Sequence, residues 1–282
     1  MRRSCLFIPS SNPGMLQSAD IYPFDAVIFD LEDAVTMSEK ESARELLKNF
    51  LSIADLKQKE IMIRINSLDN DLAMLDLDDI VSDEIDTIML PKARVSDIVY
   101  LDKVLRQIEE KKQMTKKINI VPIIELASSL LEVERIAAEK RVNGILLGAE
   151  DLTSDMEVSR TEEGTEIFYP RARIAMACKA FKIDAIDTPY TNVNNLEGLE
   201  KDSLVAKELG FNAKACIHPN QIDVINRIFS PTEKEILRAQ KIVAAYEQEK
   251  KGAFSLDGKM IDKPIIERSL KIIAKAKKIG LL

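Results

Sequence analysis

The 282-residue sequence predicts an α/β fold, a (β/α)8 TIM barrel with a C-terminal extension of helices and one hairpin. Three observations lead to this prediction. Eight short apolar runs recur along the chain, segments with helical periodicity separate most of them, and no low-complexity stretch interrupts the order. Near-continuous runs of Val, Ile and Leu are typical of strands buried on both faces of a parallel sheet. Alternating strands and helices predict such a sheet, and eight units favour its closure.

The predicted strands are short and are bounded by polar or turn-forming residues. In chain order they are Ser4–Pro9, Ala26–Leu31, Ile61–Asn66, Thr87–Pro91, Asn119–Glu125, Gly144–Gly148, Asp184–Asp187 and Ala213–Ile217. An open, doubly wound sheet is the alternative architecture. The chain contains neither a G-x-G-x-x-G nor a Walker A motif, which argues against that alternative.

The predicted helices carry apolar residues on one face. The first of them opens with Ser38 and Glu41, which we interpret as a capping box. In chain order the helices are Ser38–Leu51, Val95–Lys111, Ala127–Lys140, Pro170–Phe181, Leu196–Leu209 and Asn220–Phe229.

The C-terminal residues 230–282 are expected to extend the barrel of residues 1–229 as part of the same domain. A long helix to about Lys250, a hairpin that turns at Asp257-Gly258 and a last helix from about Pro264 are predicted there. This extension is expected to cover the barrel mouth or to reach a neighbouring subunit.

Composition excludes several classes of protein. A net charge of −7 argues against binding to nucleic acid. Cys5, Cys178 and Cys216 are too few and too far apart for a disulfide framework or a zinc site, so a reducing cytoplasm is expected. No run approaches the roughly 20 apolar residues that span a bilayer, and the N-terminal apolar run is too short for a signal peptide.

Charged residues gather directly after most of the predicted strands, where an α/β barrel carries its chemistry. A nearly full ring of charges in one cavity requires compensation, which a bound cation supplies. In chain order the strand-end residues are Asp30, Glu32, Asp33, Arg64, Asn66, Lys92, Glu125, Glu150, Asp151, Asp187 and His218.

Glu125 and Asp151 are the candidate metal ligands. Carboxylates from adjacent strands can share one Mg²⁺ ion, with water and substrate oxygens completing an octahedron. The chain offers no Cys and His ligand set, so zinc is not expected. The alternative is that the two carboxylates pair with Lys92 or Arg64, or cap the helices that follow them.

Arg64 ends a buried strand, so its guanidinium requires a partner. That partner is either a substrate carboxylate, which the guanidinium fork fits, or Asp30 or Glu32. We expect Asp30, Glu32 and Asp33 to orient basic groups or metal-bound water, with helix capping as the alternative for Asp33.

Lys92 and His218 each have a catalytic and a structural interpretation. Lys92 suits the Schiff base of an aldolase, or else a structural ion pair. His218 suits a general base, or else packing in the turn before Pro219.

A set of segments spread over the whole chain matches one family in order. The matching segments are Arg2–Ser4, Leu6–Pro9, Asn12-Pro13, Phe29–Val35, Arg64–Asn66, Leu90–Lys92, Ile124-Glu125, Gly148–Asp151, Arg160-Thr161, Ala185–Thr188, Ile217–Ile222 and Asp257–Asp262. On these segments the chain resembles the citrate lyase β subunits of the HpcH/HpaI aldolase superfamily. Tyr22-Pro23 and Asn194–Gly198 favour the citrate lyase branch.

The resemblance implies a Mg²⁺-dependent cleavage of a citryl thioester to oxaloacetate and an acetyl thioester. It places the metal on Glu125 and Asp151 and the keto-acid carboxylate on Arg64. It implies a trimer or hexamer in which Asp262 of an adjacent subunit acts as acid or base. Cap preference alone favours Asp262 as a helix N-cap. Further substrate contacts are expected at Lys92, Ala149 and Glu150.

The thioester carrier is expected to be coenzyme A or an acyl carrier protein, and citrate lyase α and γ subunits are possible partners. The phosphate groups of the carrier are expected to contact four basic residues. The alternative is that these residues form a solvated basic surface. These residues are Arg2, Arg3, Lys40 and Arg44. The chain departs from the family pattern at Ser10-Ser11, Leu126-Ala127 and Pro170. These departures concern the identity of the thioester carrier.

Two other functions compete with citryl thioester cleavage. One is the cleavage of citramalyl-CoA or malyl-CoA by the same chemistry. The other is a subunit that serves mainly to dock an acyl carrier protein and has little activity alone. The charged strand ends argue against a purely structural subunit.

Overall fold

The computed structural model describes residues 1–56, 59–249 and 253–282. The chain divides into two compact units, one of residues 2–226 and one of residues 227–282 together with Met1. In the described residues no helix combines the length and the apolar content needed to cross a bilayer.

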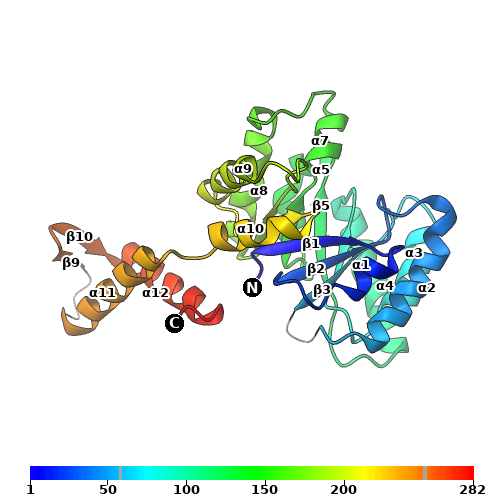
Figure 1. Ribbon diagram of the computed structural model, residues 1–282, viewed down its shortest axis with the longest axis horizontal. Helices are drawn as coiled ribbons and strands as arrows, with labels where there is room; N and C mark the ends of the chain where they lie inside the picture. Colours follow the sequence, from blue (N-terminus) through cyan, green and yellow to red (C-terminus); the bar gives the residue numbers. More distant parts are fainter. Residues whose placement is uncertain (57–58, 250–252) are drawn as a thin grey trace. The chain divides into compact units, whose positions relative to one another are not determined.

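The larger unit is a closed barrel of eight parallel strands in sequence order, which confirms the predicted fold class. Figure 1 shows helices α2, α3 and α4 outside the sheet near β1, β2 and β3. The strands are β1 (Ser4–Pro9), β2 (Ala26–Asp30), β3 (Glu60–Arg64), β4 (Thr87–Leu90), β5 (Asn119–Ile124), β6 (Gly144–Leu147), β7 (Asp184–Asp187) and β8 (Ala213–Cys216). β1 pairs with β8 as well as with β2, and this pairing closes the barrel.

The helices of the barrel unit lie mainly in the connections between strands, and the last of them, α10, continues past residue 226 into the other unit. They are α1 (Pro13–Gln17), α2 (Lys40–Ile53), α3 (Leu72–Ile80), α4 (Val95–Lys111), α5 (Ala127–Leu131), α6 (Val133–Ala137), α7 (Ala149–Asp155), α8 (Phe168–Phe181), α9 (Leu196–Leu209) and α10 (Ile222–Phe229). Short 3₁₀ turns are η1 (Met37–Glu39), η2 (Thr165–Ile167) and η3 (Pro219–Gln221).

Two helix predictions need correction. The segment Ala127–Lys140 is not one helix, because Glu132 leaves helical geometry with φ −110° and ψ 10° and separates α5 from α6. The capping box at Ser38 is wrong as well. Helix α2 begins at Lys40 after the 3₁₀ turn η1, and its N-cap Glu39 makes no side-chain cap hydrogen bond.

The barrel interior is filled by side chains from every strand. Small residues such as Ala26 and Ala213 stand with larger ones such as Met62 and Met89 in one buried cluster, and Phe7 packs against it. Such filling makes the barrel a solid core rather than a pore. The free space therefore lies at the ends of the strands, where the loops begin.

The C-terminal unit contains the predicted hairpin and helices. Its elements are α11 (Glu233–Glu249), β9 (Ala253–Leu256), β10 (Lys259–Asp262) and α12 (Lys263–Lys278). Asp257 and Gly258 both have positive φ, 50° and 72°, as a two-residue turn of this type requires. The predicted helix end at Lys250 lies outside the described residues.

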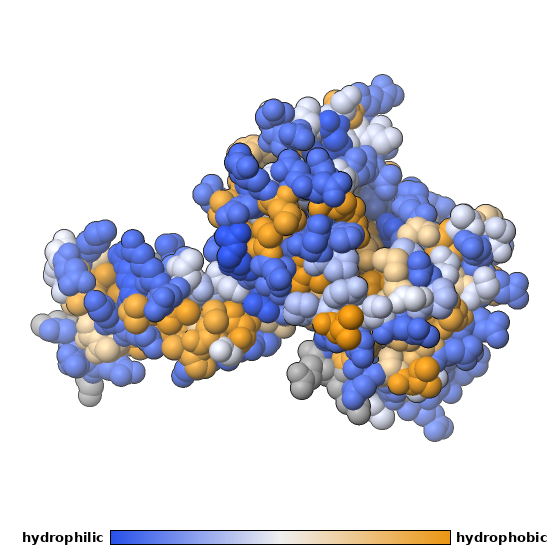
Figure 2. Space-filling view, in the orientation of Figure 1, coloured by the Kyte–Doolittle hydropathy of each residue, from blue (hydrophilic) through white to orange (hydrophobic). Residues whose placement is uncertain are grey.

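Helices α11 and α12 pack on a small apolar core formed by Ile242, Ile261 and Ile266. Other apolar side chains of this unit remain about half exposed, with Leu237 at 52% and Leu270 at 47%. Figure 2 shows apolar residues gathered on the visible face of this unit. Contiguous exposed apolar residues mark interaction surfaces.

Candidate active site

A cavity of about 480 Å³ opens at the carboxyl ends of the barrel strands. Its lining combines acidic and basic groups with apolar side chains. The lining residues are Phe7, Pro9, Met15, Asp30, Asp33, Ala34, Arg64, Ile123, Glu125, Leu146, Gly148, Ala149, Glu150, Asp151, Thr188, Pro189 and Ile217. The structure therefore brings together predicted strand-end residues from β2, β3, β5 and β6, and we take this cavity as the candidate active site.

Glu125 lies directly after β5 and is almost fully buried, with 3% of its surface exposed. Its Oε2 accepts one hydrogen bond, from the backbone N–H of Lys92 at 2.8 Å. Burial, with the nearby charges of Glu32 and Asp151, raises the pKa of Glu125 to about 8, although the Lys92 hydrogen bond opposes the rise. The ionised form of this carboxyl group therefore needs additional positive charge.

The backbone on both sides of Glu125 is shaped to admit its side chain. A Cβ atom at Gly148, after β6, would lie 2.3 Å from Glu125 Cγ, so only glycine leaves room there. On the other side, Lys92 adopts a left-handed conformation with φ 48°, which is strained for a residue with a side chain. These two features place the Glu125 carboxylate at the cavity.

Glu32 is a second buried carboxylate close to Glu125. Its Oε2 accepts no hydrogen bond in the described part of the chain, although Arg64 Nη1 lies 3.2 Å away. Burial and the charges of Asp33 and Asp30 raise the pKa of Glu32 to about 7, against the opposing effect of Arg64. Lys40 holds the same loop, because its Nζ donates to the carbonyl oxygen of Glu32 at 2.6 Å.

Arg64 is paired with Asp30. Its Nε and Nη2 donate to the two carboxylate oxygens of Asp30 at 2.7 and 2.6 Å, and the ring of Phe7 lies 5.1 Å from the guanidinium carbon. Asp30 also accepts backbone hydrogen bonds from Glu32 and Ala34. The sequence allowed either a substrate carboxylate or a protein carboxylate as the partner of Arg64. The structure shows the protein carboxylate, that of Asp30. The third nitrogen of Arg64, Nη1, donates to Asp33 at 3.4 Å and lies 3.2 Å from Glu32 Oε2.

The first turn of α7 carries three predicted site residues. Ala149, Glu150 and Asp151 all line the cavity. Ala149 is buried, whereas Asp151 is exposed and near enough to Glu125 to influence its pKa. The Glu150 carboxylate accepts a hydrogen bond from Arg160 at 3.0 Å, so it is partly occupied by a protein partner.

Lys92 and His218 each form a contact of the structural kind that we considered for them. Lys92 Nζ lies 4.0 Å from Glu32 Oε1. His218 is exposed, its Nδ1 accepts a hydrogen bond from the Asn220 backbone, and it is not among the cavity-lining residues.

The expectation that Arg2 and Arg3 meet carrier phosphates is not supported by their placement. Both precede β1 and lie at the amino-terminal end of the barrel, opposite the cavity. Arg2 is 3% exposed and forms a bidentate pair with Glu60 at 2.6 and 2.7 Å. Arg3 pairs with Asp25 in the same manner at 2.7 and 2.8 Å. Neither guanidinium is presented to a ligand at the mouth.

Lys40 and Arg44 also differ from the expected phosphate contacts. Lys40 is buried and donates to the carbonyl oxygens of Leu31 and Glu32 at 2.7 and 2.6 Å. Arg44 is buried and donates to Asp76 at 3.3 Å. Both residues support the loops after β2 and β3, because a buried cation needs protein acceptors.

Asn66 and Asp187 show that not every polar strand end faces the cavity. Asn66 Nδ2 donates to Asp76 at 2.7 Å. Asp187 is fully buried and paired with Arg171 and Lys214. Lys214 was missed at the sequence level, although a lysine inside a buried strand is a signal of a buried partner.

Glu125, which lines the cavity, and the nearby Glu32, which does not, have the chemistry of a hard-cation site. Glu125 and Glu32 have raised pKa values, and the buried Glu32 Oε2 accepts no hydrogen bond from the described residues. In those same residues, no three acidic, Cys or His side chains come together in a complete protein cage. Such an arrangement suits an ion that keeps several water ligands and takes one or two carboxylates.

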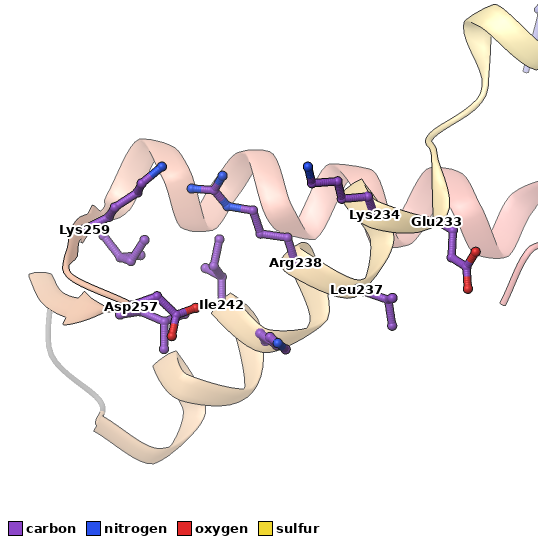
Figure 3. Close-up of a pocket in the computed structure, with 10 residues that line it drawn as sticks. Glu233, Lys234, Leu237, Arg238, Ile242, Asp257 and Lys259 are labelled. Carbon is purple, nitrogen blue, oxygen red and sulfur yellow. The ribbon is translucent and has the colours of Figure 1, made fainter.

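A second cavity, of about 640 Å³, lies within the C-terminal unit between α11 and the hairpin. Figure 3 shows Lys234, Arg238 and Lys259 extending to the same side. The charged residues that line it are all exposed, so no buried acid is poised there for chemistry. The smaller cavity of the barrel is the better candidate.

Comparison with known proteins identifies related chains. The profile of the HpcH/HpaI aldolase/citrate lyase family matches residues 3–219. Citrate lyase subunit beta of Haemophilus influenzae is 39% identical over 98% of this chain and 97% of its own. Mitochondrial citramalyl-CoA lyase of Mus musculus is 29% identical over 98% of this chain and 86% of its own.

A solved structure also resembles the chain over nearly its whole length. It is the CitE protein of Mycobacterium tuberculosis in complex with magnesium, acetoacetate and coenzyme A. The two chains are 27% identical, the alignment covers 98% of each, and the TM-score is 0.80.

We predict that Gly148→Ala weakens the binding of a divalent cation at least about tenfold, the effect expected when a supporting position is disturbed. The added methyl group would displace the Glu125 side chain. Calorimetric titration with Mg²⁺ measures the change. Gly14→Ala is the matched control, because its Cβ would meet no atom nearer than 3.5 Å. Equal affinities for both variants would show that Glu125 does not hold the ion.

The raised pKa of Glu125 predicts a pH dependence of stability in the cation-free protein. Because the folded-state pKa lies above the ordinary value of 4.5, stability is fully present below that value and is lost as the pH rises towards 8. In EDTA, the unfolding temperature of the wild type should therefore fall relative to that of Glu125→Gln between pH 5 and pH 8.5.

Glu110→Gln, at an exposed position of α4, serves as the control for this pH series and should track the wild type. A difference between wild type and Glu125→Gln that stays constant over the pH range would mean that Glu125 ionises as it does in water.

Proposed function

The chain belongs to the HpcH/HpaI aldolase/citrate lyase family, and on this premise we propose that it is a Mg²⁺-dependent lyase that cleaves a citryl thioester to oxaloacetate and an acetyl thioester. The family supports the coarser statement, a carbon–carbon lyase. The observation that carries the finer one is the pair of buried carboxylates, Glu32 and Glu125, next to Arg64.

Glu125 and Asp151 are the residues that would hold the ion. A bound Mg²⁺ stabilises negative charge on substrate oxygens by acting as a Lewis acid. Glu32 lies close to Arg64, and its charge affects the pKa of Glu125. We propose that Glu32 orients Arg64 and water molecules at the site. The magnesium in the related CitE complex supports the use of Mg²⁺, and the choice of residues is our proposal.

Arg64 is the residue that would hold the carboxylate of the keto-acid product. Asp30 fixes two of its nitrogen atoms, and Nη1, which donates to the exposed Asp33 at 3.4 Å, would turn to the substrate. A guanidinium fixed in this way loses little freedom when substrate binds, so it can set the plane of the breaking bond. We propose that Ala149 and Lys92 also contact the substrate. Glu150 would contact it through the part of its carboxylate that is not bonded to Arg160.

Cleavage requires loss of the proton of the tertiary hydroxyl group and then protonation of the departing acetyl thioester enolate. The bond between the hydroxyl-bearing carbon and the acetyl carbon breaks, and its electron pair passes into the enolate. We propose that the carboxylate of Asp262 from an adjacent copy takes up the hydroxyl proton and delivers it to the enolate, which implies a homotrimer or hexamer. General acid catalysis of this kind contributes about 10²–10⁴-fold.

The carrier of the thioester is coenzyme A or an acyl carrier protein, with citrate lyase α and γ subunits as partners in the second case. Because Arg2, Arg3, Lys40 and Arg44 are engaged within the protein, we do not retain them as phosphate contacts. The free, buried cysteines are compatible with the reducing cytoplasm that we propose as its location.

The proposed function predicts that the isolated chain releases oxaloacetate from citryl-CoA, that EDTA abolishes this release and that Mg²⁺ restores it. Glu125→Gln should lower kcat/KM by more than about a hundredfold, beyond the usual effect of a supporting residue. Glu110→Gln should leave it unchanged. Coupled spectrophotometric detection of oxaloacetate measures both variants.

The same assay with citramalyl-CoA and malyl-CoA tests the nearest alternative, which the similarity to citramalyl-CoA lyase favours. A higher kcat/KM for one of these thioesters would contradict citryl specificity. No turnover of any thioester would favour a carrier-docking subunit. A stable adduct on Lys92 after borohydride treatment would indicate a Schiff base instead.

The role of Asp262 can be separated from its structural role. In the structure its Oδ1 accepts the backbone hydrogen bond of Ile265 at 3.3 Å and caps α12. Asp262→Ser keeps an equally good cap but removes the carboxyl group. We expect unchanged thermal unfolding and a kcat about 10²–10⁴-fold lower. Full activity of this variant would assign Asp262 to capping alone.

A further inference from the structure

Four charged side chains are buried together at the edge of the barrel where β7 meets β8. Arg171 on α8 donates to both carboxylate oxygens of Asp187 at 2.9 Å and to Asp202 on α9 at 2.7 Å. Lys214 on β8 donates to the same two aspartates at 2.5 and 2.6 Å. The side chains of Arg171, Asp187 and Lys214 are at most 2% exposed, and that of Asp202 is 11% exposed.

This cluster contains two cations and two carboxylates, so its charges balance. A contribution to stability does not by itself explain why these charges are buried. Burying charges costs hydration, and well-packed apolar residues often stabilise a protein as well as a buried ion pair does. What a charged cluster adds is direction, because each hydrogen bond fixes the geometry of its partner. The question is which part of the molecule these bonds orient.

Lys214 connects the cluster to the cavity. Its third hydrogen bond, of 2.7 Å, goes to the carbonyl oxygen of Thr188, a residue that lines the cavity. The hydroxyl group of Thr188 in turn accepts the backbone N–H of Ala149 at 3.4 Å. Ala149 is the first residue of α7, and Asp151 is the third. The hydrogen bonds thus run from the buried charges to the helix that carries a proposed metal ligand.

We propose that Lys214 is a positioning residue that acts through Thr188 and Ala149 to hold Asp151 in place for the divalent cation. The cluster of Arg171, Asp187 and Asp202 would keep the Lys214 ammonium group at a fixed position against the Thr188 carbonyl. This inference rests on the proposed function, because it concerns the same Mg²⁺ site. Lys214 touches neither substrate nor metal in this account.

The combined change Lys214→Met with Asp202→Asn tests the proposal. It removes one positive and one negative charge, so the remaining Arg171–Asp187 pair stays balanced. It deletes the hydrogen bond to Thr188. We expect the dissociation constant for Mg²⁺, measured by calorimetric titration of the full chain with MgCl₂, to rise about tenfold, the lower end of the effect of supporting residues.

A matched control is available at the opposite end of the barrel. Arg2 and Glu60 also form a buried ion pair, and Arg2→Met with Glu60→Gln removes a comparable charge pair. If the Lys214 cluster only stabilises the fold, both double variants lower the unfolding temperature and both leave Mg²⁺ affinity within about twofold of wild type. We expect the affinity to fall only for the Lys214 double variant.

Thr188→Val provides a test that leaves all four buried charges in place and removes only the hydroxyl acceptor for Ala149. It should also weaken Mg²⁺ binding, and unchanged binding by this variant would overturn the proposal even if the Lys214 double variant failed to fold. Equal losses in the Lys214 and Arg2 double variants would overturn it as well. A wild type that does not bind Mg²⁺ would refute the metal site of the proposed function, and the positioning role with it.

Discussion

Two carboxyl groups, those of Glu32 and Glu125, are buried at one end of a barrel whose nearby guanidinium is already committed. Arg64 gives two of its nitrogen atoms to Asp30, so it cannot also neutralise both glutamates. Burial without full compensation raises the pKa of both groups. This shortage of positive charge destabilises the ionised forms of both groups and favours the binding of a hard cation. A bound cation can in turn bind the anionic groups of a substrate. The candidate chemistry depends on this imbalance.

The surrounding backbone keeps these carboxylates in place at some cost. Lys92 has a left-handed backbone conformation in which its N–H points at Glu125. Position 148 is glycine, and the absence of a side chain there leaves room for Glu125. Lys40 is buried to hold the carbonyl oxygens of the loop that carries Glu32. Strained and buried polar features of this kind cluster at functional sites, where the remainder of the fold compensates for them.

The sequence predicted the part of the site that depends on strand order. Glu125 and Arg64 each follow a recognisable apolar run, and the carboxyl ends of barrel strands meet at one mouth. The placement of Arg2 and Arg44 was not predictable in the same way. Their partners, Glu60 and Asp76, lie 58 and 32 positions further along the chain, so only the closed barrel shows that these side chains are occupied. Lys214 was not predicted because its partners come from β7, from Thr188 directly after β7, and from α9.

The most direct test is a crystal structure of the protein grown with Mn²⁺ and measured at a wavelength where manganese scatters anomalously. The account predicts one anomalous peak in the barrel cavity, within coordination distance of carboxylate oxygens from both Glu125 and Asp151. A cavity without such a peak, with the two carboxylates turned towards separate basic side chains, would contradict it.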